Sequence, residues 1–282
     1  MLDGGRRIHL GINIINEETQ DLKQHDLKQR DHAVPRDHCQ CDPNCKNPPL
    51  PHSAFCKVHG KGKCKRRSPM TGYEPKYQPA LWNIDEHRET HNCYAYFMNI
   101  LDSFQIEKCQ QMKNCDTLPF PQPGNAAGYN PFKSNEPKTC PNMIARILGD
   151  NSNITMTTFE EKCPPLTSKG ALVVDENEDY HFLRQDVGGW WSQKGGAKTV
   201  TNRDASGRPI WDPALANNRW SNTLDYDIFC GYFCIPRTTG LKIVFNGGSR
   251  KRKTRKVKQQ RSLIRAKKYH ISRTMRSRDR TF

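Results

Sequence analysis

Two short segments, 88 residues apart, carry residue types suited to nucleophilic catalysis. Cys93 lies in His-Asn-Cys-Tyr-Ala-Tyr, and His181 lies in Asp-Tyr-His-Phe-Leu-Arg. A thiol at the start of a helix is favoured as the thiolate by the helix N–H dipoles, and a histidine facing it from a strand can accept the proton and return it. The order predicts Cys93 as nucleophile and His181 as general base. A third polar residue should orient the imidazole, and the candidates are Gln185, Asn202 and Asp204.

Each residue of this pair also fits a structural role. Cysteine is among the residue types most often buried in cores, so Cys93 beside tyrosine and alanine suits a core position. His181 stands between two aromatic residues and suits a hydrogen-bonded position within a sheet. Because a fold does not fix a function, the catalytic and the structural interpretations both stay open at this point.

A second cluster, within residues 38–67, has the spacing of a metal site. Cys41 and Cys45 would form one pair of ligands, and Cys56 and His59 the other. Two short-spaced pairs joined by a loop supply the four tetrahedral donors of a structural zinc site. We therefore predict zinc, bound by three thiolates and one imidazole.

The competing interpretations of the cluster are disulfides and free thiols. Cys39 and Cys64 are spare or alternative ligands, and the connecting loop Lys46–Phe55 is rich in proline. Such a loop would hardly fold without a clip, which favours a metal. The first ten residues contain no apolar stretch of a secretory signal. We therefore expect reduced or metal-bound cysteines rather than disulfides.

The elements that must position these residues follow from the hydrophobic pattern. Apolar residues at helical spacing predict a helix from Thr90 through Cys93 to Leu101 and a second at Met143–Leu148. Alternating or β-branched segments predict strands at Ala171–Val174, Tyr180–Arg184, Trp190–Ser192, Ile228–Ile235 and Leu241–Phe245. Helices followed by a meandering sheet predict an α+β fold in one domain, residues 81–245.

Several segments of this domain resemble the papain-like fold of cysteine peptidases and the NlpC type of cysteine hydrolases. The similar segments are Asn-Cys-Tyr-Ala-Tyr, Pro121–Gly124, Asp-Tyr-His-Phe-Leu-Arg-Gln-Asp and Thr199–Asn202, and they span about half of the chain. The resemblance implies a helix packed on an antiparallel sheet, with Cys93 as nucleophile and His181 as base. No motif fixes the third catalytic residue, for which we predict Asn202.

The net charge of +16 is concentrated in one terminal segment. Residues 250–282 hold 15 Lys and Arg against one acid, whereas the first 249 residues hold 30 basic and 28 acidic side chains. The body is therefore nearly neutral, and the basicity belongs to a tail. The organisation we predict is a polar arm (1–37), a zinc module (38–67), a Pro-rich linker (68–80), the α+β domain (81–245) and a basic tail (246–282).

The tail is suited to an anionic partner. Its first cations can pair with phosphates in a salt-dependent manner, and they are Arg250, Lys251, Arg252, Lys253, Arg255, Lys256 and Lys258. Few aromatic residues are interleaved, so base stacking is not indicated. Nucleic acid, an anionic membrane and an acidic protein surface are all electrostatically suitable, and a nuclear-localisation signal is the simplest alternative.

The tail and the Cys-rich module resemble segments of virion proteins of large nucleocytoplasmic DNA viruses. This resemblance implies a structural virion component similar to a minor capsid protein, made in the host cytoplasm and placed on the inner face of the capsid. Its partners would be other capsid proteins and, through the tail, the viral genome or an inner membrane. No apolar run reaches the ~18–20 residues of a transmembrane segment. The alternative function is an active cysteine peptidase or amidase.

Overall fold

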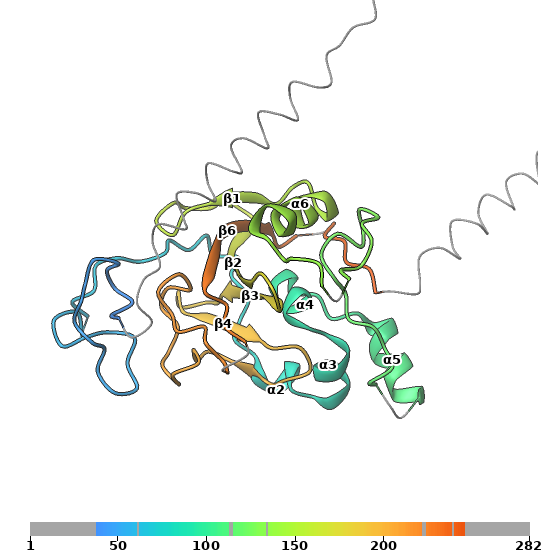
Figure 1. The fold of residues 1–282 in the computed structure, drawn as a ribbon, viewed down its shortest axis with the longest axis horizontal. Helices are drawn as coiled ribbons and strands as arrows, with labels where there is room; N and C mark the ends of the chain where they lie inside the picture. The colour runs from blue at the N-terminus through green and yellow to red at the C-terminus, as the bar shows by residue number, and fades with distance from the viewer. Residues whose placement is uncertain are drawn as a thin grey trace, which may run out of the picture.

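The computed structural model describes residues 38–60, 62–112, 115–133, 135–221, 224–238 and 240–245. A six-stranded antiparallel sheet crosses the body in the order β1-β6-β2-β3-β4-β5, with helices around it (Figure 1). The α+β class predicted from the sequence is confirmed. The predicted N-terminal arm and the basic tail lie outside the described residues.

Most elements of the body are short. The helices are α2 (Pro79–Trp82), α3 (Asp85–Thr90), α4 (Cys93–Met98), α5 (Ser103–Met112) and α6 (Cys140–Asp150). The strands are β1 (Thr155–Thr157), β2 (Thr167–Asp175), β3 (Asp179–Gln185), β4 (Trp191–Lys194), β5 (Val200–Thr201) and β6 (Ile228–Pro236).

The two faces of the sheet carry different cores. Ala171 and Val173 of β2 join the side that faces the Cys-rich module, whereas Leu172 and Val174 join the side that faces α4 and α6. This alternation follows from the two-residue period of a strand. Both faces of β2 are therefore buried, as its nearly unbroken apolar run indicates.

Helix α4 begins and ends at two asparagines. The Asn92 side chain accepts a hydrogen bond from the backbone N–H of Ala95 (3.2 Å), which caps the first turn. Asn99 adopts the left-handed conformation (φ 56°) and ends the helix. Cys93 is thereby fixed as the first residue of α4, as predicted.

Helix α4 lies directly against the backbone of β2. A Cβ atom added at Gly170 would lie 2.2 Å from Phe97 Cε2 and 2.5 Å from Ile235 Cδ1. Phe97 also packs on Phe182 of β3, with ring centroids 4.7 Å apart. The helix can therefore reach this depth only because position 170 has no side chain.

A buried arginine joins the end of α4 to β3. Arg184 donates to Asp186 Oδ1 (3.1 Å), to Asn99 Oδ1 (2.7 Å) and to the Tyr96 carbonyl (3.3 Å). Its guanidinium also lies 3.7 Å from the centroid of the Tyr96 ring. Asp186 and these oxygens compensate the buried charge, which fixes the C-terminal end of α4 over the sheet.

The structure extends some predicted elements and removes one. The predicted strand Leu241–Phe245 is wrong, because only Phe245 pairs, in an isolated bridge with Pro121. Pairing of β6 runs instead with β1 and β2. Helix α5 was not predicted, since its polar sequence gives only a weak apolar face.

Replacing Gly170 with alanine should destabilise the fold by about 2–3 kcal/mol, because the methyl group overlaps Phe97 and Ile235. Gly195→Ala is the matched control, since its Cβ would meet only Lys198, at 3.6 Å. Chemical denaturation of both variants gives the two free energies of unfolding. Equal values would contradict the close approach of α4 to β2.

Candidate functional site

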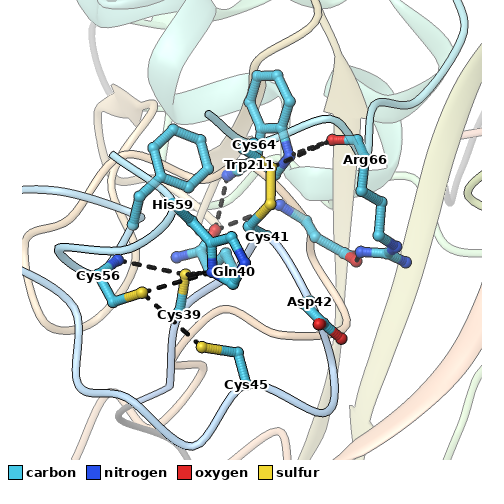
Figure 2. The surroundings of a disulfide bond; sticks show 12 residues. Cys39, Gln40, Cys41, Asp42, Cys45, Cys56, His59, Cys64, Arg66 and Trp211 are labelled. Atoms are coloured by element: carbon cyan, nitrogen blue, oxygen red, sulfur yellow. Dashed lines mark hydrogen bonds and ion pairs between the residues drawn. A yellow bond between two sulfur atoms is a disulfide. The ribbon is translucent and has the colours of Figure 1, made fainter. Parts of the chain in front are cut away.

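Four potential ligands converge in the Cys-rich module. The sulfurs of Cys39, Cys45 and Cys56 and a ring nitrogen of His59 all lie within 4.8 Å of one another. Figure 2 shows these four side chains pointing toward one another. Cys39 Sγ and Cys56 Sγ each lie 3.4 Å from His59 Nδ1, and the sulfurs of Cys45 and Cys56 are 3.7 Å apart. A tetrahedral metal with metal–sulfur bonds of ~2.3 Å and a metal–nitrogen bond of ~2.0 Å requires edges of about 3.5–3.8 Å. The cluster therefore fits a metal ion bound by three cysteines and one histidine.

Short turns bring these ligands together. The backbone N–H of Cys45 donates to the Asp42 carbonyl (3.0 Å), and that of His59 donates to the Cys56 carbonyl (3.2 Å). The backbone N–H of Cys56 donates to the Cys39 sulfur at 3.2 Å. Burial raises the pKa of the Cys39 thiol to about 11. Burial acts in the same direction on Cys56, but hydrogen bonds from the His59 and Val58 backbone and from neighbouring thiols lower its pKa to about 7.

The predicted ligand set needs one correction. Cys41, assigned to the metal from its spacing, forms a disulfide with Cys64 across a Cα–Cα distance of 5.6 Å. Cys39 takes its place in the cluster, while Cys45, Cys56 and His59 are brought together as predicted. Spacing alone could not separate Cys39 from Cys41, because the two cysteines are two residues apart and the ligand spacing does not reveal the disulfide that engages Cys41.

The residue between the two cysteines ties the module to the body. Gln40 is only 2% exposed. Its Oε1 accepts from the backbone N–H groups of Trp211 (2.7 Å) and Asp212 (3.2 Å), and its Nε2 lies 3.3 Å from Asp204 Oδ2. Arg66 pairs with Asp212 as well. The module is therefore docked on the segment that follows β5.

Disulfides, not free thiols, account for most cysteines of the body. Cys140 of α6 is bonded to Cys230 of β6, and Cys163 is bonded to Cys234 of the same strand. A further bond closes the short loop between Cys109 and Cys115. The prediction of reduced or metal-bound cysteines is therefore wrong for eight of the 12. The free thiols are Cys93 and the three of the metal cluster.

A cavity of about 690 Å³ contains both halves of the predicted catalytic pair. Cys93 and His181 both line it. The remaining wall is formed by the turn 195–199 and by aromatic residues, and its members are Asn92, Phe120, Gln122, Asp179, Tyr180, Gln193, Gly195, Gly196, Ala197, Lys198, Thr199, Thr201, Trp220, Leu224 and Tyr226. Its volume is that of a small-ligand site.

The Cys93 thiol is deeply buried and uncharged. Its residue is 6% exposed. Burial raises the pKa of Cys93 to about 12, with the nearby Asp179 acting in the same direction. Hydrogen bonds from the backbone N–H groups of Phe182 and Tyr94 and the charge of Lys194 oppose this shift without reversing it. The helix start therefore does not generate a resting thiolate.

His181 is held by an amide on the neighbouring strand. Its Nε2 lies 2.7 Å from Gln193 Oε1, and its ring stacks on Tyr226 with centroids 5.3 Å apart. Burial lowers the pKa of His181 to about 4, although the Gln193 bond favours the charged form. Within the residues that the structure describes, neither its Nδ1 nor the Cys93 sulfur forms a hydrogen bond to the other. The two side chains share the cavity as separate neutral groups.

The orienting role predicted for Asn202 falls to Gln193. Asn202 is absent from the cavity wall, whereas Gln193 both lines the cavity and bonds to the imidazole. Gln193 pairs with Leu183, and His181 lies two residues before Leu183 on β3. Gln193 and His181 therefore lie on the same face of the sheet. A sequence cannot give this register before the length of the hairpin turn is known.

A buried lysine near Cys93 was also missed. Lys194 is fully buried, and its Nζ donates to the carbonyls of Arg88 (2.7 Å) and Gly196 (2.5 Å). Burial lowers the pKa of Lys194 to about 7. Its position at the end of β4, before two glycines, resembles an ordinary turn in sequence, so no local signal identified it.

The predicted anion-binding residues from Arg250 to Lys258 lie outside the described residues. No described helix is long and apolar enough to cross a membrane.

Comparisons with known proteins gave one informative match. Over 142 residues the chain is 34% identical to insoluble matrix shell protein 1 of Ruditapes philippinarum, covering 50% of this chain and 80% of that protein. No family model matches the chain, and no solved structure matches it.

The alkylation rate of Cys93 by iodoacetamide should rise about tenfold per pH unit from about pH 7 to about pH 10 without a plateau, because only the thiolate reacts. Peptide-level mass spectrometry of the native protein separates Cys93 from the cluster thiols. His181→Gln should leave the profile unchanged. A plateau near pH ~8 that disappears in this variant would instead reveal an activated thiolate–imidazolium pair.

Proposed function

The chain belongs to the family of insoluble matrix shell protein 1, and from this premise we propose that it is a structural protein of an extracellular matrix. The observation that carries the proposal is the disulfide framework. Disulfides persist in oxidising compartments and outside cells, and they are rare in the cytosol. The family relationship and the cysteine chemistry therefore support the same environment.

The framework is arranged to hold the sheet together. Two bonds converge on β6, from Cys140 at the start of α6 and from Cys163 in the segment after β1. The first closes a loop with a sequence separation of 90 residues. A loop of that size contributes about 4 kcal/mol through the entropy of the unfolded chain. Such resistance to unfolding suits a protein that must persist outside the cell.

A structural role within a virion remains the prediction from the resemblance of the Cys-rich module and the tail. The capsid location, the capsid partners and the contacts with genome or membrane stay predictions, and the tail lies outside the described residues. They share with the present proposal the idea that the chain acts as a component of an assembly.

We further propose that zinc occupies the Cys39, Cys45, Cys56 and His59 cluster. Three thiolates and one imidazole suit zinc, and four protein ligands leave no open position for catalysis. The ion would connect the start of the module to its second half. Gln40, next to Cys39, would then be held in place for its contacts with the body.

A cysteine hydrolase is the second candidate. The favouring observation is that Cys93, His181 and Gln193 converge on one cavity, with Gln193 bonded to the imidazole. The neutral state and high pKa of Cys93 favour the structural role. The alkylation profile of Cys93 decides between these two interpretations.

An antibody against the folded domain should label the extracellular matrix of the tissue that produces the protein. The protein isolated from that tissue is then used for peptide mapping. Peptide mapping without reduction should show the Cys140–Cys230 and Cys163–Cys234 pairs, because both bonds are formed in the folded chain. Labelling confined to the cytoplasm, with all 12 thiols free to alkylate, would contradict the matrix role. Labelling of viral particles would favour the virion prediction instead.

Cysteine-to-serine variants should distinguish metal ligands from disulfide partners by their zinc content. Cys39→Ser should abolish stoichiometric zinc and the thiolate-to-cobalt absorption of the cobalt-substituted protein, since one of four ligands is lost. The double variant Cys41→Ser/Cys64→Ser should keep both signals. Loss of zinc in the double variant and its retention in Cys39→Ser would restore the ligand set predicted from the sequence. Absence of zinc from the wild-type protein would refute the zinc site.

A further inference from the structure

Strand β3 has a partner along only part of its β4 edge. It runs from Asp179 to Gln185, but its pairing with β4 covers only Leu183, Arg184 and Gln185. No described strand or isolated bridge pairs with residues 179–182 on that side. The first half of β3 is therefore an open edge inside an otherwise covered sheet.

The backbone direction of this open half follows from the hairpin turn that joins β3 to β4. The Asp186 N–H donates to the Trp190 carbonyl (2.8 Å), so it points to the β4 side. Backbone groups of a strand alternate in direction with a period of two residues. The N–H and C=O of Tyr180 therefore point to the same side and have no strand partner there among the described residues.

The 690 Å³ cavity lies along this open half. Asp179, Tyr180 and His181 form one wall, and the turn through Gly196 forms another. Trp220 lies at the cavity as a 39% exposed indole. The space thus combines an unpaired strand edge with an aromatic surface for an apolar side chain.

One polar group on the cavity wall lacks its partner. Gln122 Oε1 is buried and accepts no hydrogen bond from the described residues. Its segment is fixed, because Asn92 Nδ2 donates to the carbonyl of the preceding Pro121 at 2.9 Å. A buried acceptor without a donor costs free energy, so this segment of the wall carries a polar group that the described residues do not satisfy.

We propose that this cavity binds an extended peptide segment of another protein, which adds a strand to β3 at Tyr180. Main-chain hydrogen bonds to Tyr180 provide the binding, and an apolar side chain packs against Trp220. Asp179 and Lys198 contribute one charge of each sign, so recognition depends mainly on the peptide main chain. The site requires no reaction at Cys93, and it would link this protein to a neighbour in an assembly.

A random-peptide display library tests the site, with selection on the wild-type chain and depletion on Ala197→Trp. Ala197 is an exposed residue of the cavity wall, so the indole should fill the cavity without disturbing the core. Glu107→Trp on the exposed face of α5 is the matched control. Selected peptides should bind the wild type and Glu107→Trp equally and bind Ala197→Trp at least about tenfold more weakly.

N-methylation of the selected peptide identifies the binding mode. The N–H groups of an extended peptide alternate between its two edges, and only one edge pairs with β3. Methylation of the N–H groups on that edge should abolish binding, whereas methylation on the opposite edge should not. The Tyr180 amide should become protected from hydrogen exchange. Failure to enrich peptides, insensitivity to N-methylation, or binding of an N-acetylglucosamine tetramer in place of peptides would each overturn the proposal.

Two controls keep the result interpretable. Thermal unfolding of Ala197→Trp should match the wild type, and Lys198→Trp, at another exposed position of the wall, replaces it if the first variant fails to fold. The extracellular location of the protein is measured independently with the antibody. Loss of peptide binding and loss of the matrix role are therefore separate outcomes.

Discussion

The close approach of α4 to the backbone of β2 at Gly170 is the constraint on which the candidate site depends. With Phe97 seated over the missing side chain, the helix lies deep enough for its first residue to reach the edge of β3. Cys93 then lines the same cavity as Tyr180 and His181 of β3. A packing requirement at one end of the helix thus sets the position of the thiol at the other.

Links other than apolar packing hold the rest of the molecule in place. Two disulfides converge on β6, and Arg184 joins the end of α4 to the sheet. On the opposite face, Gln40 binds the segment around Trp211, so the Cys-rich module and the body share one hydrogen-bond network. The later part of that segment supplies Trp220 and Tyr226 to the cavity, which connects the module to the cavity wall through the chain.

Sequence reasoning found the residues that meet in space but not how each is used. Periodicity located α4, α6 and the central strands because burial imposes a regular apolar spacing on them. Cys93 and His181 were placed near one another by the order of their elements. The role of Gln193 depends on strand register, and the place of Cys39 in the cluster goes with the disulfide that engages Cys41. Disulfide connectivity could not follow from spacing, because many pairings of 12 cysteines satisfy the same sequence.

The Cys41–Cys64 bond has a consequence for maturation. Its loop encloses Cys45, Cys56 and His59, whereas Cys39 stays outside. Before a metal binds, three thiols therefore lie beside a newly formed disulfide and can exchange with it. A bound metal would remove them from that chemistry by holding them as ligands. If the cluster binds a metal as proposed, the final pairing of this module would depend on the order of two events, metal capture and oxidation.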